Sequence, residues 1–151
     1  MKYVITGAAS GIGRAVAGLL ATKRGADPLK LLLVDRDEAG LRDASSELVR
    51  AGVDSALVAA DLADPGQIGL VAQQAENVLG GVDGLVSNAG LIKPGLLKDL
   101  AIADYEQVFN VNTRATWLLA KAMYPMLRSA KGAVVATASL VSENPAPALG
   151  A

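Results

Sequence analysis

The sequence predicts an α/β protein in which helices cover both faces of a parallel β-sheet. Five short runs of apolar residues alternate with four longer runs whose apolar residues recur at helical spacing. The short runs are apolar throughout, which is typical of parallel strands covered on both faces. Because parallel strands are joined by crossover connections, this alternation indicates a doubly wound sheet with helices packed on it.

The first three expected strands are separated by two expected helices. Residues 3–5, 31–34 and 56–59 are short strands rich in leucine and β-branched residues. The first helix begins at about Ile12, where apolar residues follow at the i, i+3, i+4 and i+7 positions. The second helix, residues 38–50, is more polar and carries a narrow apolar stripe. Both helices are long enough to connect parallel strands.

The second part of the chain repeats this pattern. A helix is expected over residues 65–79, because a proline suits its first turn and the preceding aspartate suits its cap. Residues 84–87 and 133–136 are the fourth and fifth strands. One long helix over residues 104–128 is expected between them, since its apolar residues share one face. No internal repeat or linker divides the chain.

Composition excludes several classes of protein. The 151 residues suffice for a single domain, residues 1–151, and 52% of them are apolar. The chain has no histidine and no cysteine. This excludes histidine-based hydrolysis, the usual zinc sites and a disulfide framework, so we expect no metal site. A net charge of −1 and only 3% aromatic residues argue against a nucleic-acid partner.

No segment of the sequence indicates targeting or a membrane. The apolar run near the N-terminus is too short for the core of a signal peptide. No stretch approaches the roughly 20 apolar residues that a membrane helix needs. We therefore expect a soluble cytoplasmic protein without a membrane partner.

A glycine-rich turn joins the first strand to the first helix. Gly7, Gly11 and Gly13 stand where the backbone must turn tightly and approach a ligand. The helix begins near Ser10 and Ile12, and its unpaired N–H groups and dipole favour a phosphate there. The spacing is neither that of a P-loop nor a strict GxGxxG pattern. A tight turn without a ligand is the alternative interpretation.

Asp35 lies at the end of the second strand, about 20 residues beyond the glycine-rich turn. A carboxylate at this place accepts hydrogen bonds from the 2′ and 3′ hydroxyls of an adenosine ribose. It also repels a 2′-phosphate, which favours NAD over NADP as the cofactor. The neighbouring Arg36 weakens this preference, because an arginine there is able to accommodate the phosphate. A solvated charge at a strand end is the alternative interpretation of Asp35.

Further motifs follow the predicted strands in order. The stretch Thr6-Gly7-x-x-x-Gly11-Ile12-Gly13 follows the first strand, Asp61-Leu62 the third, and Ser87-Asn88-Ala89-Gly90 the fourth. Together they resemble the short-chain dehydrogenase/reductase family, although Ser87 stands where that family has an Asn. The resemblance spans the chain and implies a Rossmann-like fold with five strands in the order 3-2-1-4-5. It also implies that these motifs bind the cofactor, with Asp61 and Leu62 at the adenine ring.

Two residues match catalytic positions of the family. Asn112 falls in the long helix, where the resemblance implies that an Asn distorts the helix and holds a water of the proton relay. Asn is in any case a poor helix former, and Asn110 is the alternative in register. Ser139 matches the serine at the end of the fifth strand, which orients and polarises the substrate carbonyl. Thr137 is the weaker alternative for that role, and a strand-end serine that binds local backbone is the alternative interpretation of Ser139.

The resemblance implies an NAD(P)-dependent oxidoreductase that acts on a small-molecule carbonyl compound or secondary alcohol. The family's general acid/base is a Tyr assisted by a Lys four residues later, and this Tyr should follow Ser139. No Tyr follows Ser139 in this chain. Tyr124 has Arg128 four residues later, but it precedes the fifth strand and an Arg is not the matching partner. We therefore interpret its spacing as a chance likeness to the motif and not as the catalytic Tyr. We expect a chain truncated within its active site, lacking the family's C-terminal strands and helices and inactive on its own.

Two other functions stay open at this point, a non-catalytic dinucleotide-binding module and another Rossmann-like binder such as a methyltransferase. By resemblance, the complete protein is a homo-oligomer, a dimer or tetramer that pairs through the long helix. The apolar strand at 133–136 is expected to lie at a bare sheet edge, so the isolated chain should self-associate. Residues that suggest either an apolar pocket edge or ordinary packing positions are Leu91, Ile92, Leu140, Val141 and Pro145.

Overall fold

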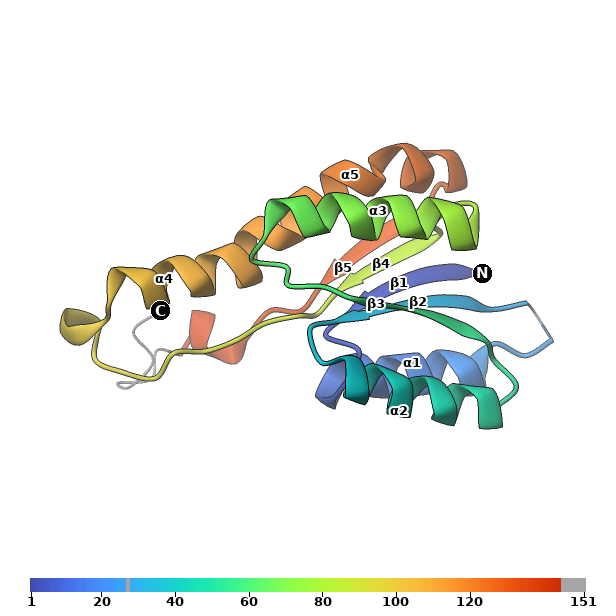
Figure 1. The fold of residues 1–151 in the computed structure, drawn as a ribbon, viewed down its shortest axis with the longest axis horizontal. Helices are drawn as coiled ribbons and strands as arrows, with labels where there is room; N and C mark the ends of the chain where they lie inside the picture. The colour runs from blue at the N-terminus through green and yellow to red at the C-terminus, as the bar shows by residue number, and fades with distance from the viewer. Residues whose placement is uncertain (27, 145–151) are drawn as a thin grey trace.

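A computed structural model describes residues 1–26 and 28–144 of the chain (Figure 1). Five parallel strands form one sheet in the order β3-β2-β1-β4-β5. The strands are β1 (Lys2–Thr6), β2 (Lys30–Asp35), β3 (Ser55–Ala59), β4 (Gly84–Ser87) and β5 (Ala133–Ala136). The predicted Rossmann-like fold class and strand order are confirmed.

Helices cover both faces of this sheet (Figure 1). On one face lie α1 (Gly11–Lys23) and α2 (Glu38–Arg50), which connect β1, β2 and β3. On the other face lie α3 (Pro65–Leu79) and α5 (Ala115–Ala130). None of the helices in the described part of the chain is long and apolar enough to cross a membrane.

Successive strand residues point to opposite faces and build two apolar clusters. Val4 and Leu32 are partners in register and are fully buried beneath α3 and α5. Ile5 and Leu33, the next register pair, are fully buried beneath α1 and α2. Burial of each such side chain contributes roughly 1.5–3 kcal/mol. A stretch of strand that is covered on both faces therefore needs apolar residues at successive positions, as the middle of β1 and the middle of β2 have.

The long helix predicted over residues 104–128 is interrupted in its middle. α4 (Ile102–Phe109) leads into a π-helical turn, η2 (Asn110–Arg114), before α5 begins. The periodicity alone does not predict this interruption, whereas the distortion at Asn112 that the resemblance implies is observed. π turns are rare and frequently lie at functional sites, and the side chain of Asn112 in this turn pairs with the backbone of Leu91. Two short 3₁₀ turns, η1 (Leu97–Asp99) and η3 (Leu140–Ser142), lie in stretches for which the sequence predicts no element.

The carboxyl ends of the strands meet at one edge of the sheet, as the parallel arrangement requires. Between the adjacent strands β1 and β4 the strand order reverses, so the connections leave in opposite directions. Such a switch point leaves a crevice in which open α/β sheets bind their ligands. The glycine-rich turn follows β1 at this point, and the segment that begins at Asn88 follows β4.

Candidate cofactor-binding site

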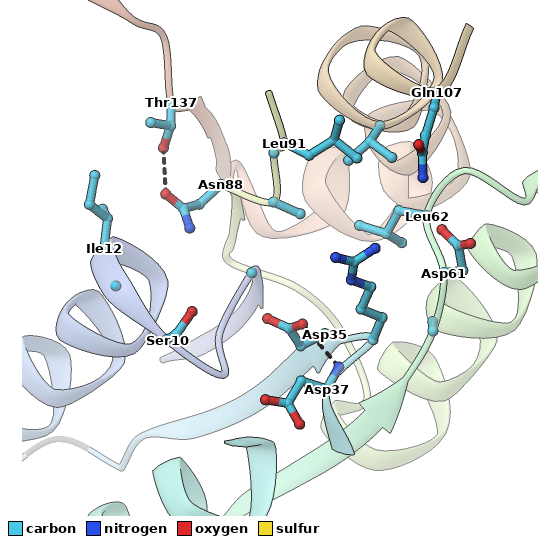
Figure 2. Close-up of a pocket in the computed structure, with 17 residues that line it drawn as sticks. Ser10, Ile12, Asp35, Asp37, Asp61, Leu62, Asn88, Leu91, Gln107 and Thr137 are labelled. Carbon is cyan, nitrogen blue, oxygen red and sulfur yellow. Dashed lines mark hydrogen bonds between the residues drawn. The ribbon is translucent and has the colours of Figure 1, made fainter. Parts of the chain in front are cut away.

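A cleft of about 510 Å³ opens at the carboxyl edge of the sheet (Figure 2). All five strand ends contribute to its walls. The lining residues are Gly7, Ser10, Gly11, Ile12, Asp35, Arg36, Asp37, Ala60, Asp61, Leu62, Asn88, Ala89, Gly90, Leu91, Gln107, Val111 and Thr137. Every residue that the sequence proposes for cofactor binding is in this set except Gly13.

The three glycines of the turn after β1 meet two steric requirements, a left-handed backbone and close packing. Gly7 and Gly11 have φ angles of 66° and 52°, a left-handed conformation that costs glycine little. A Cβ atom on Gly13 would lie 2.1 Å from the carbonyl oxygen of Gly7. Gly13 therefore lets the first turn of α1 pack directly on the loop, behind the cleft wall. This explains why Gly13 does not itself line the cleft.

Helix α1 presents its N-terminus to the cleft. Ser10 is the N-cap residue, with an extended backbone, and its side chain makes no capping hydrogen bond. The side chain is exposed and points into the cleft (Figure 2). The first N–H groups of a helix have no partner within it and carry the positive end of its dipole. The loop and helix together are therefore suited to bind an anionic group such as a phosphate.

The carboxylate of Asp35 is held by two backbone N–H groups. The N–H of Ala9 donates to Oδ2 and the N–H of Asp37 donates to Oδ1, both at 3.1 Å. Asp37 in turn caps α2, because its Oδ1 accepts a hydrogen bond from the N–H of Gly40 at 3.0 Å. Each carboxylate oxygen of Asp35 keeps lone-pair capacity for a further donor. The side chain lies on the cleft wall (Figure 2).

Thr6 fixes the loop after β4 against the end of β1. Its fully buried hydroxyl oxygen accepts hydrogen bonds from the N–H groups of Asn88 and Ala89, each at 3.0 Å. The same hydroxyl donates to the carbonyl oxygen of Val86 at 3.5 Å. Gly7 packs closely on this loop, since a Cβ there would lie 3.0 Å from the backbone of Ala89. The two strand ends therefore form one rigid floor for the cleft.

Asp61 and Leu62 follow β3 on the opposite wall. Leu62 is buried, and Oδ1 of Asp61 accepts a hydrogen bond from the N–H of Ala63 at 2.9 Å. Farther along this turn Asp64 caps α3, and the hydrogen bond from the N–H of Gly66 is the main reason that the pKa of Asp64 lies below its ordinary value. An apolar side chain beside an exposed carboxylate suits a flat base with a polar edge.

Asn112 lies in the π turn and binds Leu91, the residue that follows the Ser87–Gly90 segment. Its Oδ1 accepts from the N–H of Leu91 and its Nδ2 donates to the carbonyl oxygen of Leu91, both at 2.9 Å. Helix distortion at this position is observed, as the resemblance implies. Asn112 itself does not line the cleft. Its role in a proton relay stays a prediction, and Asn110 makes no such contact in the described part of the chain.

Ser139 is also outside the cleft lining. It is the N-cap residue of η3, and its hydroxyl oxygen accepts a hydrogen bond from the N–H of Val141 at 3.4 Å. Thr137, two residues earlier, lines the cleft and donates its hydroxyl hydrogen to Oδ1 of Asn88 at 3.0 Å (Figure 2). The proposed catalytic role of Ser139 stays a prediction. Of the suggested apolar pocket edge, Leu91 lines the cleft, and Pro145 lies outside the described residues.

Sequence reasoning missed several lining residues. Gln107 and Val111 come from α4 and the π turn, and the side chain of Gln107 points toward Leu62 across the cleft (Figure 2). Their i, i+4 spacing just before Asn112 was the available signal. Ala60 directly follows the third predicted strand, and Asp37 lies two residues beyond Asp35. No group of three or more metal-ligating side chains occurs in the part of the chain that the structure describes.

Comparison with known proteins identifies similarity over nearly the whole chain. The model of the short chain dehydrogenase family matches residues 2–151. A curated relative, a versicolorin reductase of Emericella nidulans, is 33% identical over 136 residues, which cover 90% of this chain and 50% of the relative. The chain therefore spans about half the length of the curated relatives it matches.

Two solved structures with the same fold contain nicotinamide cofactors. A short chain dehydrogenase/reductase from Burkholderia phymatum in complex with NAD is 32% identical, with a TM-score of 0.89. The match covers 99% of this chain and 52% of that structure. L-Sorbose reductase from Gluconobacter frateurii, complexed with NADPH and L-sorbose, is 31% identical, with a TM-score of 0.91. That match covers 98% of this chain and 56% of the reductase.

Proposed function

The chain belongs to the short chain dehydrogenase family, and on this premise we propose that it is the cofactor-binding part of an oxidoreductase. The complete protein would act on a small-molecule carbonyl compound or secondary alcohol. A nicotinamide dinucleotide, when bound, supplies or accepts the hydride. The single observation that carries this proposal is one cleft shared by the N-terminus of α1 and the carboxylate of Asp35.

The residues of the cleft fit such a dinucleotide. The backbone of Gly7 and Gly11 and the open N-terminus of α1 would hold the phosphates. Asp35 would accept hydrogen bonds from the adenosine ribose, since its oxygens are fixed by backbone N–H groups and keep lone pairs. The wall formed by Asp61 and Leu62 would hold the adenine ring.

We propose that NAD is preferred to NADP. The carboxylate of Asp35 would face a 2′-phosphate with like charge at a position that backbone hydrogen bonds hold in place. Arg36 also lines the cleft and is exposed, so it reduces this repulsion. Similar proteins are known with NAD and with NADPH, and the balance between Asp35 and Arg36 would decide the preference here.

Two residues of this chain are proposed to assist the reaction. Ser139, at the loop after β5, would orient the substrate carbonyl through its hydroxyl. Asn112 would hold the loop at Leu91, and through it the wall of the cleft, in a fixed position. By resemblance, a Tyr and a Lys would complete the catalytic set, and we propose that the chain without them transfers no hydride.

We propose that the complete protein forms a homodimer or homotetramer through the outer side of α4 and α5. Exposed aromatic side chains gather along these helices, among them Tyr105, Phe109, Trp117 and Tyr124. The rings of Tyr105 and Phe109 are 4.3 Å apart, and Nζ of Lys121 lies over the ring of Trp117. Large exposed apolar areas commonly mark interfaces. A cytoplasmic location stays a prediction.

Binding of NADH by a Ser10→Asp variant tests the cofactor site. Aspartate is as good an N-cap as serine, so the variant should fold normally. Its negative charge at the N-terminus of α1 should repel the phosphates and weaken NADH binding at least about tenfold. Ser46→Asp, an exposed change on α2 away from the cleft, is the matched control and should bind as the wild type does. Equal affinity of the Ser10 and Ser46 variants would contradict the proposed site.

A further inference from the structure

One hydrogen bond joins the loops after β4 and β5 at the cleft. The hydroxyl of Thr137 donates to Oδ1 of Asn88 at 3.0 Å (Figure 2). The backbone N–H of Thr137 also donates to the carbonyl oxygen of Ser87 at 3.0 Å, so the backbone of Thr137 is fixed as well. The Thr137 side chain is therefore held where its hydroxyl can position Asn88.

Asn88 is restrained both at its backbone and at its side-chain amide. Its backbone N–H donates to the buried hydroxyl of Thr6, and its side-chain oxygen accepts from Thr137. Nδ2 lies against the glycine-rich loop, because a Cβ atom on either Gly7 or Gly13 would be 2.9 Å from it. Among the described residues, no hydrogen-bond acceptor takes the two N–H donors of Nδ2. A half-buried amide thus has its donors unused at a binding cleft.

The sheet order shows which end of a dinucleotide this amide would meet. Asp35 ends β2, on one side of the glycine-rich loop that follows β1. Asn88 and Thr137 follow β4 and β5, on the other side of that loop. If Asp35 holds the adenosine ribose and the loop holds the phosphates, Asn88 faces the half beyond the phosphates. The groups there that accept hydrogen bonds are the oxygens of the nearer phosphate, of the ribose and of the nicotinamide carboxamide.

We propose that Thr137 is a positioning residue, which holds the Asn88 side chain so that Nδ2 donates to an oxygen on the nicotinamide side of the dinucleotide. This inference rests on the proposed function. Without the Thr137 hydroxyl, Oδ1 of Asn88 loses its partner and the side chain is free to rotate toward water. Its donors then leave the position beside Gly7 and Gly13, and one hydrogen bond to the ligand is lost.

Replacement of Thr137 by valine tests the proposal, because valine keeps the shape and removes the hydroxyl. Thr137→Val should weaken NADH binding about 3- to 10-fold, the value of one hydrogen bond. Binding of AMP, which has no nicotinamide half, should be unchanged. Thr137→Ser retains the hydroxyl and should restore NADH binding. Thr116→Val is the matched control, since it removes a hydroxyl pair with Ser87 behind the cleft and should leave both affinities unchanged.

The possible outcomes separate the positioning role from the proposed function. If wild type binds NADH and Thr137→Val binds it equally well, the positioning role is wrong and the proposed function stands. An equal loss of NADH and AMP binding would also overturn the positioning role. If wild type binds neither ligand, the proposed function fails. In that case, NMR tests the positioning role. The signals of the Asn88 side-chain amide are assigned with the help of the Asn88→Asp variant. The positioning role requires that these signals shift in Thr137→Val.

Discussion

Asn112 and Leu91 are joined by two hydrogen bonds of 2.9 Å, in which the side-chain amide of one pairs with the backbone of the other. This pairing ties the π turn between α4 and α5 to the loop that leaves β4. Gly90 precedes Leu91, and a Cβ on Gly90 would lie 3.4 Å from Oδ1 of Asn112, so the approach is close. The pairing gives a physical reason for the π turn, which places Asn112 opposite the loop.

We expect Asn112→Ala to lower the free energy of unfolding by about 1 kcal/mol. Two hydrogen bonds of about 0.5–1.5 kcal/mol each are lost, and the better helix propensity of alanine offsets roughly 0.6 kcal/mol. Asn110→Ala should act in the opposite direction, because it gains helix propensity and removes no side-chain hydrogen bond within the described residues. Urea unfolding followed by circular dichroism measures both changes. A larger loss for Asn110→Ala would show that the sequence register was assigned wrongly.

Asp35 should control the choice between NADH and NADPH. Asp35→Ala should weaken NADH binding about 10- to 100-fold, because hydrogen bonds to a charged group are worth about 1.5–3 kcal/mol. NADPH binding should improve, since the like charge near the 2′-phosphate is removed while Arg36 stays in the cleft. Dissociation constants from NADH and NADPH fluorescence titrations measure the two effects.

Two further variants separate the charge of Asp35 from its shape. Asp35→Asn keeps an acceptor for the N–H of Ala9 and removes the charge, so it should improve NADPH binding with a smaller loss of NADH binding. Asp43→Ala removes an exposed charge from α2, away from the cleft, and should change neither affinity. Equal binding of NADH and NADPH by the wild-type chain would defeat the argument for Asp35.

Much of the candidate site could be predicted because its residues lie at strand ends. Parallel strands bring their carboxyl ends to one edge, so Gly7, Asp35 and Asn88 converge in the cleft whatever the details of packing. Gln107 and Val111 reach the cleft from a helical segment. Only the packing of that segment decides which of its faces borders the cleft. Spacing along the chain does not contain this information.

The interruption of the long helix could not be predicted from helical periodicity. The apolar stripe of residues 104–128 continues through the π turn, so the pattern alone reads as one helix. The turn depends on contacts of Asn112 with Leu91, a residue 21 positions away in sequence. Local propensity shows that asparagine is unfavourable in a helix. It does not show which contacts compensate for the unfavourable propensity.

The cap of α3 should make stability depend on pH. The pKa of Asp64 in the folded chain is lower than its ordinary value of 3.8, chiefly because of the hydrogen bond from the N–H of Gly66. Because the folded-state pKa is lowered, the carboxylate makes its full contribution to the free energy of unfolding at pH values above the ordinary pKa. This contribution is lost as the pH falls through the lower folded-state value. Asp64→Ala should therefore reduce the melting temperature more at about pH 7 than at about pH 3.

The control for this pH experiment is Asp54→Ala, which removes an exposed carboxylate just before β3. Thermal unfolding of both variants and of the wild type at the two pH values gives the comparison. The Asp54 variant should differ little from the wild type at either pH. A loss in the Asp64 variant that is as large at acidic pH as at neutral pH would mean that the charge of the cap does not contribute.

The 151-residue chain should self-associate through β5. Within the described residues this strand pairs only with β4, and its side chains are exposed, with Val134 at 42% and Val135 at 60%. An apolar strand with an unpaired edge is a template for pairing with another chain.

Val135→Lys should reduce association, because a charged side chain on the edge disfavours that pairing. Val78→Lys, at a valine of α3 that is 40% exposed, should leave association unchanged. Sedimentation velocity over roughly a hundredfold range of concentration measures it, and a wild-type chain that stays monomeric throughout would contradict this prediction.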